Sequence, residues 1–438
     1  MVRLGPRLEN FFWASGIEDT FVPQTRRGHR ALDEYELMGH YDNWREDILL
    51  AKEVGVNSIR WGIPWYKVEP KEGEWDWSWI DEVLPFIVEE CGITLIADLM
   101  HYGTPFWLER EFLHPDYPKY VSRYAKEFAK RYGSLVKYYT PLNEPLVNAL
   151  WAGKRGLWPP YLKGDRGYIK LMLQIARGMI ATVEEIKSVD PNAIMVQVEA
   201  TGLTRADRLE LNALAIEDQH RGYLCFDLLT GRVHKSHPLF PWLLRNGATI
   251  DELREFTHRA IKLDVLGLNF YPQWSTQQLY TDPKGRLAYR ATEQDGSGFA
   301  TMIEDYYRRY NAPVIVTETS AFGSDDLRLQ WLHSSLDAIK RLRENGIPVY
   351  GYTWFPMMTM IDWRYRTSSA PMEHFYVELG MYRLKRGDDQ GDPIRDANSR
   401  WIRTPLVEEF RRMKAAAEKS IGICSYSTPF DIPHPHVG

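Results

Sequence analysis

Two glutamates stand in contexts that suit acid–base chemistry on a substrate. Glu144 lies in the run Asn143-Glu144-Pro145, and Glu318 lies within Val316–Ser320. Hydrolysis of a glycosidic bond needs two carboxyl groups that face each other across a sugar. One stays protonated to give a proton to the leaving oxygen, and the other is ionised to attack the anomeric carbon or activate water. Because the two glutamates are far apart in the chain, this chemistry depends on a fold that brings them together.

Further polar and aromatic side chains occur at or just after the ends of predicted strands. They are Glu18, Arg60, His101, Asn143, Asn269, Tyr271 and Trp354. The interiors of α/β barrels favour Val, Ile and Leu, so a convergence of these residue types indicates a site. We expect Arg60 to pair with Glu318 and hold it ionised, with Asn269 also supporting it and Tyr271 donating a hydrogen bond. Asn143 is placed to bind a sugar hydroxyl, and Trp354 to form a flat floor under the ring.

The elements that must position these residues alternate along the whole chain. Short β-branched runs predict eight strands: Asn10–Ala14, Ser58–Trp61, Thr94–Leu99, Lys137–Leu142, Ala193–Val198, Val265–Phe270, Val314–Thr317 and Val349–Trp354. Amphipathic stretches between them predict helices: Asp42–Val54, Ile80–Glu90, Lys119–Tyr132, Tyr168–Val189, Arg205–Leu229, Asp251–Leu263, Thr301–Tyr310, Leu327–Asn345 and Pro405–Lys419. This alternation is typical of an α/β protein with a (β/α)₈ TIM barrel. A doubly wound sheet is disfavoured, because the chain has no G-x-G-x-x-G motif.

The barrel is expected to be a single catalytic domain, residues 1–438, with long βα loops at its C-terminal face. Gln277–Arg290 predicts a hairpin about Asp282-Pro283-Lys284-Gly285, and Arg364–Ser399 predicts a long polar loop. Both would lie at the face where such barrels carry their active sites. The Pro-rich segment 420–438 is expected to pack outside the barrel as a tail.

Composition limits the class of protein and its partners. The chain has 438 residues and a net charge of −5, which gives no electrostatic case for nucleic acid or an acidic membrane as a partner. Its three cysteines are far apart and form no CxxC pair, so neither a disulfide framework nor a zinc site is expected. No apolar run reaches 18 residues, which argues against a membrane-spanning helix. We expect a cytoplasmic protein without a metal site.

Several motifs together resemble one family of sugar-cleaving enzymes. These are RWGIPWYKVEP at Arg60–Pro70, LMHYGTP at Leu99–Pro105, TPLNEP at Thr140–Pro145, LNFY at Leu268–Tyr271, VTETS at Val316–Ser320 and Trp354 with Asp362-Trp363. They are similar to motifs of glycoside hydrolase family 1, the β-glucosidase family, and follow the same order over nearly the whole chain. The resemblance implies a retaining β-glycosidase that acts on a small glycoside or oligosaccharide without a cofactor. Glu144 would be the acid/base and Glu318 the nucleophile. His101, Asn143, Tyr271, Trp354, Asp362, Trp363 and Glu18 would contact the sugar.

The sequence departs from the family pattern around the sugar rather than at the two glutamates. Gly16 stands where the family usually has a Gln that grips sugar hydroxyls, and Tyr102 stands where a Trp usually follows the strand-three His. Thr319-Ser320 replaces the usual Asn-Gly, and Asp362 replaces a Glu. The reaction type is therefore better indicated than the identity of the sugar.

Three other functions remain open at this stage. An endo-acting barrel glycanase and a transglycosidase would use the same carboxylate pair. A non-catalytic sugar-binding barrel would keep the fold and lose turnover. The sequence alone does not choose among them.

Overall fold

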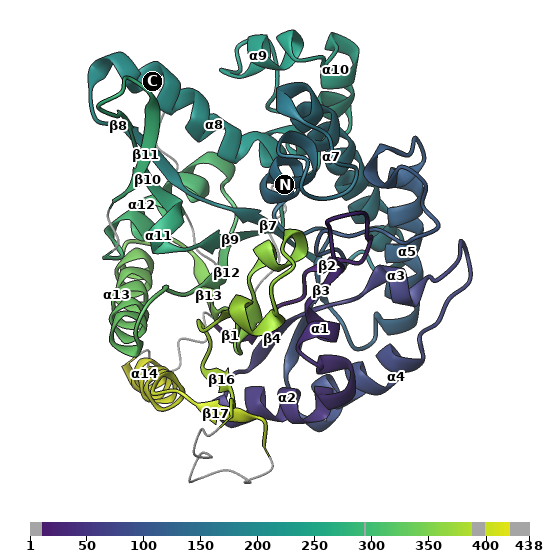
Figure 1. Cartoon of the computed structure of the whole chain (residues 1–438), viewed down its shortest axis with the longest axis vertical. Coiled ribbons are helices and arrows are strands. Elements are labelled where there is room, and N and C mark those ends of the chain that lie inside the picture. Colours follow the sequence, from purple (N-terminus) through teal and green to yellow (C-terminus); the bar gives the residue numbers. More distant parts are fainter. Residues whose placement is uncertain (1–10, 293–294, 388–398, 421–438) are drawn as a thin grey trace.

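Eight parallel strands form a closed barrel at the centre of the computed structural model, which describes residues 11–292, 295–387 and 399–420 (Figure 1). Around the barrel the strands run in the order β1-β13-β12-β9-β7-β6-β5-β4. They are β1 (Phe12–Gly16), β4 (Ser58–Gly62), β5 (Thr94–Asp98), β6 (Tyr138–Thr140), β7 (Ile194–Ala200), β9 (Val265–Phe270), β12 (Val314–Thr319) and β13 (Val349–Trp354). All eight predicted strands are present with small differences at their ends, so the predicted (β/α)₈ TIM barrel is confirmed.

Branched and aromatic side chains fill the lower part of the barrel. One buried cluster inside it consists of Phe12, Ile96, Ile194, Val196, Val198, Val265 and Ile315. The barrel is therefore a packed core, as expected for eight strands. The polar side chains near the carboxyl ends of the strands lie above this core.

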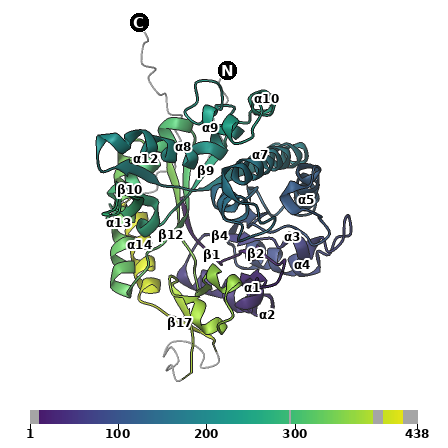
Figure 2. The ribbon, with the colours of Figure 1, turned by 45° about the horizontal axis from the view of Figure 1, so that its top comes forward.

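Helices surround the strands in both ribbon views (Figures 1 and 2). The longer ones are α2 (His40–Val54), α4 (Ser78–Pro85), α5 (Tyr117–Tyr132), α7 (Gly164–Val189), α8 (Asn212–Leu229), α10 (Ile250–His258), α12 (Ser297–Tyr310), α13 (Asp325–Glu344) and α14 (Leu406–Ser420). The shorter ones are α1 (Glu34–Leu37), α3 (Trp65–Val68), α6 (Pro145–Asn148), α9 (Phe240–Arg245) and α11 (Pro272–Ser275). Within the described residues, no helix is both long enough and apolar enough to span a membrane.

The segment after β7 differs from the prediction of one helix over Arg205–Leu229. Its first residues form strand β8 (Leu203–Ala206), and helix α8 begins only at Asn212. Strand β8 pairs with β10 (Thr276–Thr281), which continues into β11 (Leu287–Ala291). The predicted hairpin at Gln277–Arg290 is thus confirmed. Its free edge supplies the hydrogen bonds that make Leu203–Ala206 extended, a long-range effect that local pattern does not reveal.

The segment after β13 is more regular than the predicted polar loop over Arg364–Ser399. Its short strands are β15 (Tyr376–Val377), paired with β14 (Met360–Ile361), and β16 (Tyr382–Leu384), paired with β17 (Trp401–Arg403). Another two-stranded pair, β2 (Phe21–Val22) and β3 (Leu32–Asp33), follows β1. Residues 388–398, part of the predicted loop, and 421–438 of the predicted tail lie outside the described residues.

Candidate active site

The two predicted reacting glutamates lie on different barrel strands at the carboxyl-terminal end. Glu318 is the fifth residue of β12, and Glu144 precedes helix α6 just after β6. Glu318 is 4% exposed and Glu144 is 6% exposed, so both carboxyl groups are buried. Glu144 has φ 44° and ψ 67°, a left-handed conformation that costs a non-glycine residue about 1–3 kcal/mol. Such strain is typical of a position that function constrains.

Arg60 and Tyr271 hold the carboxylate of Glu318. Arg60 Nη1 donates to Glu318 Oε1 at 2.6 Å, and the Tyr271 hydroxyl donates to Oε2 at 2.7 Å. Arg60 Nη2 also donates to Asn143 Oδ1 at 2.7 Å and to Asp98 Oδ2. One buried guanidinium therefore connects β4, β5, β6 and β12 beneath the site. This geometry matches what the sequence predicts for Arg60 and Tyr271.

Glu144 is surrounded by neutral donors instead of a cation. The Tyr102 hydroxyl donates to Oε2 at 2.6 Å, and Asn269 Nδ2 donates to Oε1 at 2.9 Å. Burial, followed by the negative charge of Glu318, raises the pKa of Glu144 to about 7, and the two donors oppose that rise. A carboxyl group with a pKa near neutrality can both give and take a proton at neutral pH.

Asn269 contacts a different carboxyl group from the one predicted. It was expected to support Glu318, but its amide donates to Glu144 and, at 3.3 Å, to Asn143 Oδ1. The cause is local: the register between β12 and β9 shifts after Val316, and Thr317 Oγ1 donates to Asn269 Oδ1 at 2.6 Å. That bond turns the NH₂ group of Asn269 away from Glu318. In this structure Asn269 is a partner of Glu144.

His101 lies in a network of acidic residues next to the two glutamates. Its Nδ1 is 2.7 Å from Asp19 Oδ1 and 3.2 Å from Asp98 Oδ2, and its Nε2 is 2.8 Å from Asn143 Nδ2. Burial lowers its pKa, but Asp19 and Asp98 outweigh burial and raise the pKa well above the usual range. The Asn143 amide favours the neutral form of His101 instead. Its Nδ2 can only donate, so the hydrogen bond needs a lone pair on His101 Nε2. His101 is 3% exposed and lies close to Glu144 and Glu318.

Glu18 and a second glutamate, Glu34, lie on the side of the site formed after β1. Thr20 Oγ1 donates to Glu18 Oε1 at 2.6 Å, and the Thr20 carbonyl accepts from the Glu34 amide at 3.0 Å. Burial raises the pKa of Glu18 to about 7, with His101 lowering it and Asp19 adding to the rise. Burial and then Glu18 raise the pKa of Glu34 well above its usual range. Glu34 was not among the predicted residues.

The structure explains the loss of the usual Gln at position 16. A Cβ at Gly16 would lie 2.7 Å from the ring of Phe355 and 3.1 Å from the Arg60 carbonyl oxygen. The Phe355 ring also lies 5.7 Å from the Arg60 guanidinium carbon. Any side chain at position 16 would therefore require Phe355 to move, so the residue that usually grips sugar hydroxyls has no space here.

The predicted aromatic residues occupy different environments. Trp354 has no exposed surface, and its indole N–H donates to the Leu379 carbonyl at 2.9 Å. Trp363 is partly exposed and packs in an aromatic cluster with Tyr102, Trp151 and Trp158, at ring-centroid distances of 5.6, 5.4 and 5.1 Å. Asp362 binds Arg364 through both carboxylate oxygens, at 2.9 and 2.7 Å. Its carboxylate is thus held by a local ion pair.

Several residues of the site were not predicted from the sequence. Asp98 and Asp19 were missed, although Asp98 precedes His101 by three residues at the end of a strand and Asp19 follows Glu18 directly. These positions, beside predicted site residues, were the feature of the sequence that could have identified Asp98 and Asp19. Glu199 was not predicted either; it accepts from the Leu146 amide at 3.1 Å, within the short helix that follows Glu144. It therefore fixes the backbone that carries Glu144. Burial raises the pKa of Glu199 well above its usual range.

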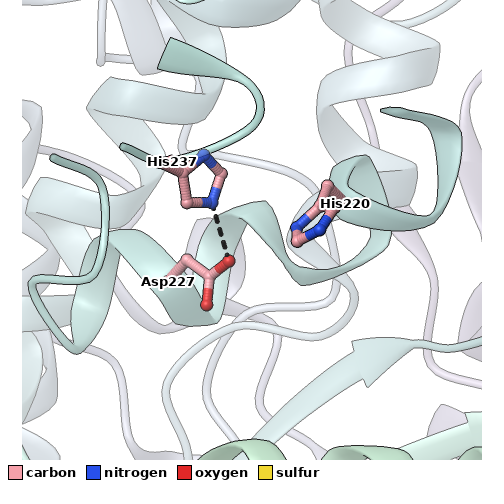
Figure 3. A group of neighbouring side chains, drawn as sticks. All are labelled: His220, Asp227 and His237. Carbon is pink, nitrogen blue, oxygen red and sulfur yellow. Dashed lines mark hydrogen bonds and ion pairs between the residues drawn. The ribbon is translucent and has the colours of Figure 1, made fainter. Parts of the chain in front are cut away.

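Two groups of described residues have the composition and spacing of a metal site: Asp19, Asp98 and His101 in the crater, and His220, Asp227 and His237 beside α8 (Figure 3). In the crater group, the Arg60 guanidinium already binds Asp98. In the second group, Arg309 donates to both oxygens of Asp227, at 2.9 and 2.6 Å. An arginine on the carboxylate competes directly with a cation. Neither group is therefore arranged for a metal ion as it stands.

Comparison with known proteins places the site in context. The model of the family described as Glycosyl hydrolase family 1 matches residues 14–207, a range that includes Glu144 but not Glu318. A 1,4-beta-D-glucan glucohydrolase of Thermotoga neapolitana is 21% identical, over 74% of this chain and 82% of its own length. Beta-glucosidase 47 of Arabidopsis thaliana is 25% identical, over 81% of this chain and 73% of its own length.

Solved structures show the same barrel at lower sequence identity. A beta-glucosidase from Thermotoga maritima, solved in complex with noeuromycin, superimposes with a TM-score of 0.77 at 17% identity. The match covers 94% of this chain and 99% of the other. The fold is therefore shared over essentially the whole length of that protein, even though most side chains differ.

Proposed function

This chain belongs to glycoside hydrolase family 1 as a distant member, and on that premise we propose that it is a retaining β-glycosidase. The observation that carries the proposal is the unequal environment of its two buried glutamates. Glu318 is paired with Arg60 at 2.6 Å, whereas Glu144 has neutral donors and a pKa of about 7. Two carboxyl groups with different electrostatic environments are what separates a nucleophile from an acid/base.

In the proposed reaction Glu318 attacks the anomeric carbon while Glu144 protonates the departing oxygen. Arg60 provides the positive charge beside the attacking carboxylate, and Tyr271 fixes its orientation. Glu144, now ionised, then removes a proton from water, which attacks the glycosyl–Glu318 ester and releases the sugar. Each carboxyl group returns to its starting state, so the cycle needs no cofactor.

The proposed substrate is a small β-linked glycoside or oligosaccharide with an unusual sugar preference. His101, Asn143, Glu18, Asp362, Trp354 and Trp363 are proposed to surround the non-reducing sugar. The match to enzymes named as glucosidases and a glucohydrolase supports a β-linked hexoside. The absence of a side chain at Gly16 supports weaker selection among hydroxyl configurations. We further propose one catalytic domain over the chain, and a cytoplasmic location in keeping with the free thiols of Cys91 and Cys225.

A 2-deoxy-2-fluoro β-glycoside bearing a good leaving group tests the assignment. Its glycosyl–enzyme ester should accumulate, and mass analysis of peptides should find the label on Glu318. Glu318→Ala and Glu144→Ala serve as matched controls, and both should lose turnover of an aryl β-glycoside. A label on another residue, or turnover unaffected by both substitutions, would overturn the proposal.

A panel of aryl β-glycosides then defines the substrate. Gluco, galacto, fuco, xylo, manno and glucurono substrates should give kcat/KM values without a strong preference for glucose. Strict selection of glucose would contradict the role given to Gly16. Cleavage of long polymers without cleavage of aryl monosaccharides would point to an endo-acting glycanase instead.

A further inference from the structure

Tyr102 lies against the proposed acid/base at a position where the family usually has a tryptophan. Its hydroxyl donates to Glu144 Oε2 at 2.6 Å and accepts from Asn143 Nδ2 at 2.9 Å. Its backbone has φ 83°, a left-handed conformation that is rare for a tyrosine. The ring is 2% exposed and packs on Trp158 at 4.8 Å and Trp363 at 5.6 Å. Strained backbone and tight packing together fix the hydroxyl between the two polar side chains.

The hydrogen bonds of Asn143 are fully used within the protein. A side-chain amide has two N–H donors and two acceptor lone pairs. Asn143 Oδ1 accepts from Arg60 at 2.7 Å and from Asn269 at 3.3 Å. Asn143 Nδ2 faces His101 Nε2 at 2.8 Å and the Tyr102 hydroxyl at 2.9 Å. Tyr102 therefore takes an N–H that Asn143 would otherwise offer to a sugar hydroxyl.

The two oxygens of Glu144 differ in what they can do with a proton. Oε1 faces the NH₂ group of Asn269, which can only donate, so the Oε1 lone pair on that side cannot carry a proton. Oε2 faces the Tyr102 oxygen, and a phenolic hydroxyl can donate or accept after rotating its hydrogen. Tyr102 can thus donate to the carboxylate form of Glu144 and accept from its carboxylic acid form without moving a heavy atom.

Other groups around Glu144 come from every neighbouring strand. They are Glu318 on β12, Tyr271 and Asn269 at the end of β9, Glu199 on β7, His101 after β5 and Arg60 on β4. Glu318 and Glu199 disfavour a charge on Glu144, while His101 favours it. Tyr102 and Asn269 are the two that reach the Glu144 oxygens by a hydrogen bond in the described residues, and only the hydroxyl can reverse its direction.

We propose that Tyr102 is the positioning residue of the acid/base, holding Glu144 through both of its protonation states and occupying the N–H of Asn143. This inference rests on the proposed function, because it assigns Tyr102 a role only if Glu144 is the acid/base. In the first step the Tyr102 hydroxyl holds Oε2 in place while Glu144 gives its proton to the departing oxygen; in the second it donates to the Glu144 carboxylate that activates water. The same hydroxyl also accepts one N–H of Asn143, so it connects Glu144 to Asn143.

Tyr102→Phe tests the proposal, because it removes the hydroxyl and keeps the ring between Trp158 and Trp363. Loss of a donor to the carboxylate raises the pKa of Glu144, so the basic limb of the kcat/KM profile should move to higher pH. We expect kcat/KM at neutral pH to fall about 100-fold on a glycoside with a poor leaving group, the lower end of the range for proton-transfer catalysis. A dinitrophenyl glycoside, whose leaving group needs little protonation, should be affected much less in its first step.

Two variants complete the test. Tyr352→Phe is the matched control: this buried tyrosine has its hydroxyl 2.9 Å from Ser335 Oγ on α13, and its loss should leave the pH profile unchanged. Tyr102→Trp installs the usual family residue and should move the basic limb in the same direction as Tyr102→Phe. An unmoved limb in both Tyr102 variants overturns the inference. Restoration of Glu144→Ala activity by azide tests the proposed function separately, so the two can fail independently.

Discussion

Two buried clusters of this protein use the same residue types and reach opposite states. In the crater, Arg60 and His101 lie among Asp19, Asp98 and Glu318. Beside α8, His237 lies on Asp227 (Figure 3), and Arg309 binds the same carboxylate. Each cluster joins a histidine, an arginine and a carboxylate at a short distance. The difference between them lies in how completely the charges and hydrogen bonds are balanced.

The cluster beside α8 is closed, in the sense that both oxygens of its carboxylate have hydrogen-bond donors within the protein. Both oxygens of Asp227 accept from Arg309, and they also accept from Tyr310 at 3.0 Å and His237 at 3.0 Å. The pKa of Asp227 is lowered because these partners outweigh its burial. Such a cluster holds α8, the following loop and the end of α12 together. Each oxygen of Asp227 therefore has two donors.

The crater cluster is unbalanced. Among the described residues near Glu144 and Glu318, carboxyl groups outnumber cations, and Oε1 of Glu34 and Oδ1 of Asp98 are buried without a hydrogen-bond partner. Glu18 and Glu144 both have pKa values raised to about 7. Buried polar atoms without a partner cost stability, and they concentrate at functional sites. Imbalance, more than residue type, distinguishes the crater from the cluster beside α8.

The largest predicted effect follows removal of the crater's guanidinium. Arg60→Met should lower kcat/KM on an aryl β-glycoside by about 1,000-fold or more, because Glu318 loses the charge that orients and stabilises it. It should also cost about 3–5 kcal/mol of stability, since Asp98 and Glu318 stay buried without their cation. Kinetics on the folded fraction, together with denaturant unfolding, separates the two effects. A stable Arg60→Met enzyme with near-normal turnover would show that the crater needs no such charge.

Asp227→Asn makes the corresponding change in the closed cluster. The substitution keeps the shape of the side chain and removes its charge beside Arg309, so we expect a loss of about 3 kcal/mol in the free energy of unfolding. At temperatures where the variant is folded, kcat and KM should equal those of the parent enzyme. Chemical denaturation and steady-state kinetics check both parts. A lowered kcat in folded Asp227→Asn would break the contrast between the two clusters.

The two clusters should respond to pH with opposite signs. The folded pKa of Asp227 is lowered, so its stabilising contribution is present at neutral pH and is lost as pH falls below about 4. The folded pKa of Glu144 is raised from 4.5 to about 7, so its folded form binds more protons between these values. The contribution of Glu144 to the free energy of unfolding is therefore greatest below about pH 4.5, and it is lost as the pH rises to about 7.

Glu144→Gln isolates this effect in the crater. Because the amide cannot ionise, the variant should be more stable than the parent enzyme at pH 8, by up to about 3 kcal/mol, and equally stable near pH 4.5. Thermal unfolding at the two pH values measures the difference. Asp227→Asn is the matched comparison, since its deficit should be largest at neutral pH and shrink in acid. A gain for Glu144→Gln that did not depend on pH would reflect packing and not charge.

The same contrast explains what could be predicted from sequence. The eight strands were predictable because each β-branched run is followed by an amphipathic segment, and parallel strands deliver their ends to one face. Glu144, Glu318, Arg60 and Tyr271 were therefore placed together correctly. The partner of Asn269 was not, because it depends on a register shift in β12 after Val316. Local residue patterns do not encode such a shift.

Contacts that depend on backbone dihedral angles or on long-range strand pairing could likewise not be predicted from the sequence. Tyr102 was recognised as a departure, but the direction of its hydroxyl follows from a φ of 83°. Glu34 belongs to the site only because the β2–β3 pair brings it back to Thr20, and its carboxylate accepts from the Ile361 amide at 3.0 Å. Both are consequences of tertiary structure. The two glutamates and the partners of Glu318 were predictable, and the partners of Glu144 were not.

The smallest predicted effect is the response of the cluster beside α8 to metal ions. His237 Nδ1 accepts the Leu239 amide N–H at 3.1 Å, so its proton lies on Nε2 and is donated to Asp227. A metal on Nε2 would have to displace that proton and leave the ring without a hydrogen on either nitrogen, while also competing with Arg309. Zn²⁺ should therefore raise the melting temperature of the parent enzyme no more than that of His220→Ala, and EDTA should leave kcat unchanged. A Zn²⁺-dependent rise that His220→Ala abolishes would mean that Arg309 yields to the ion, and the cluster would then be a metal site held closed by its own arginine.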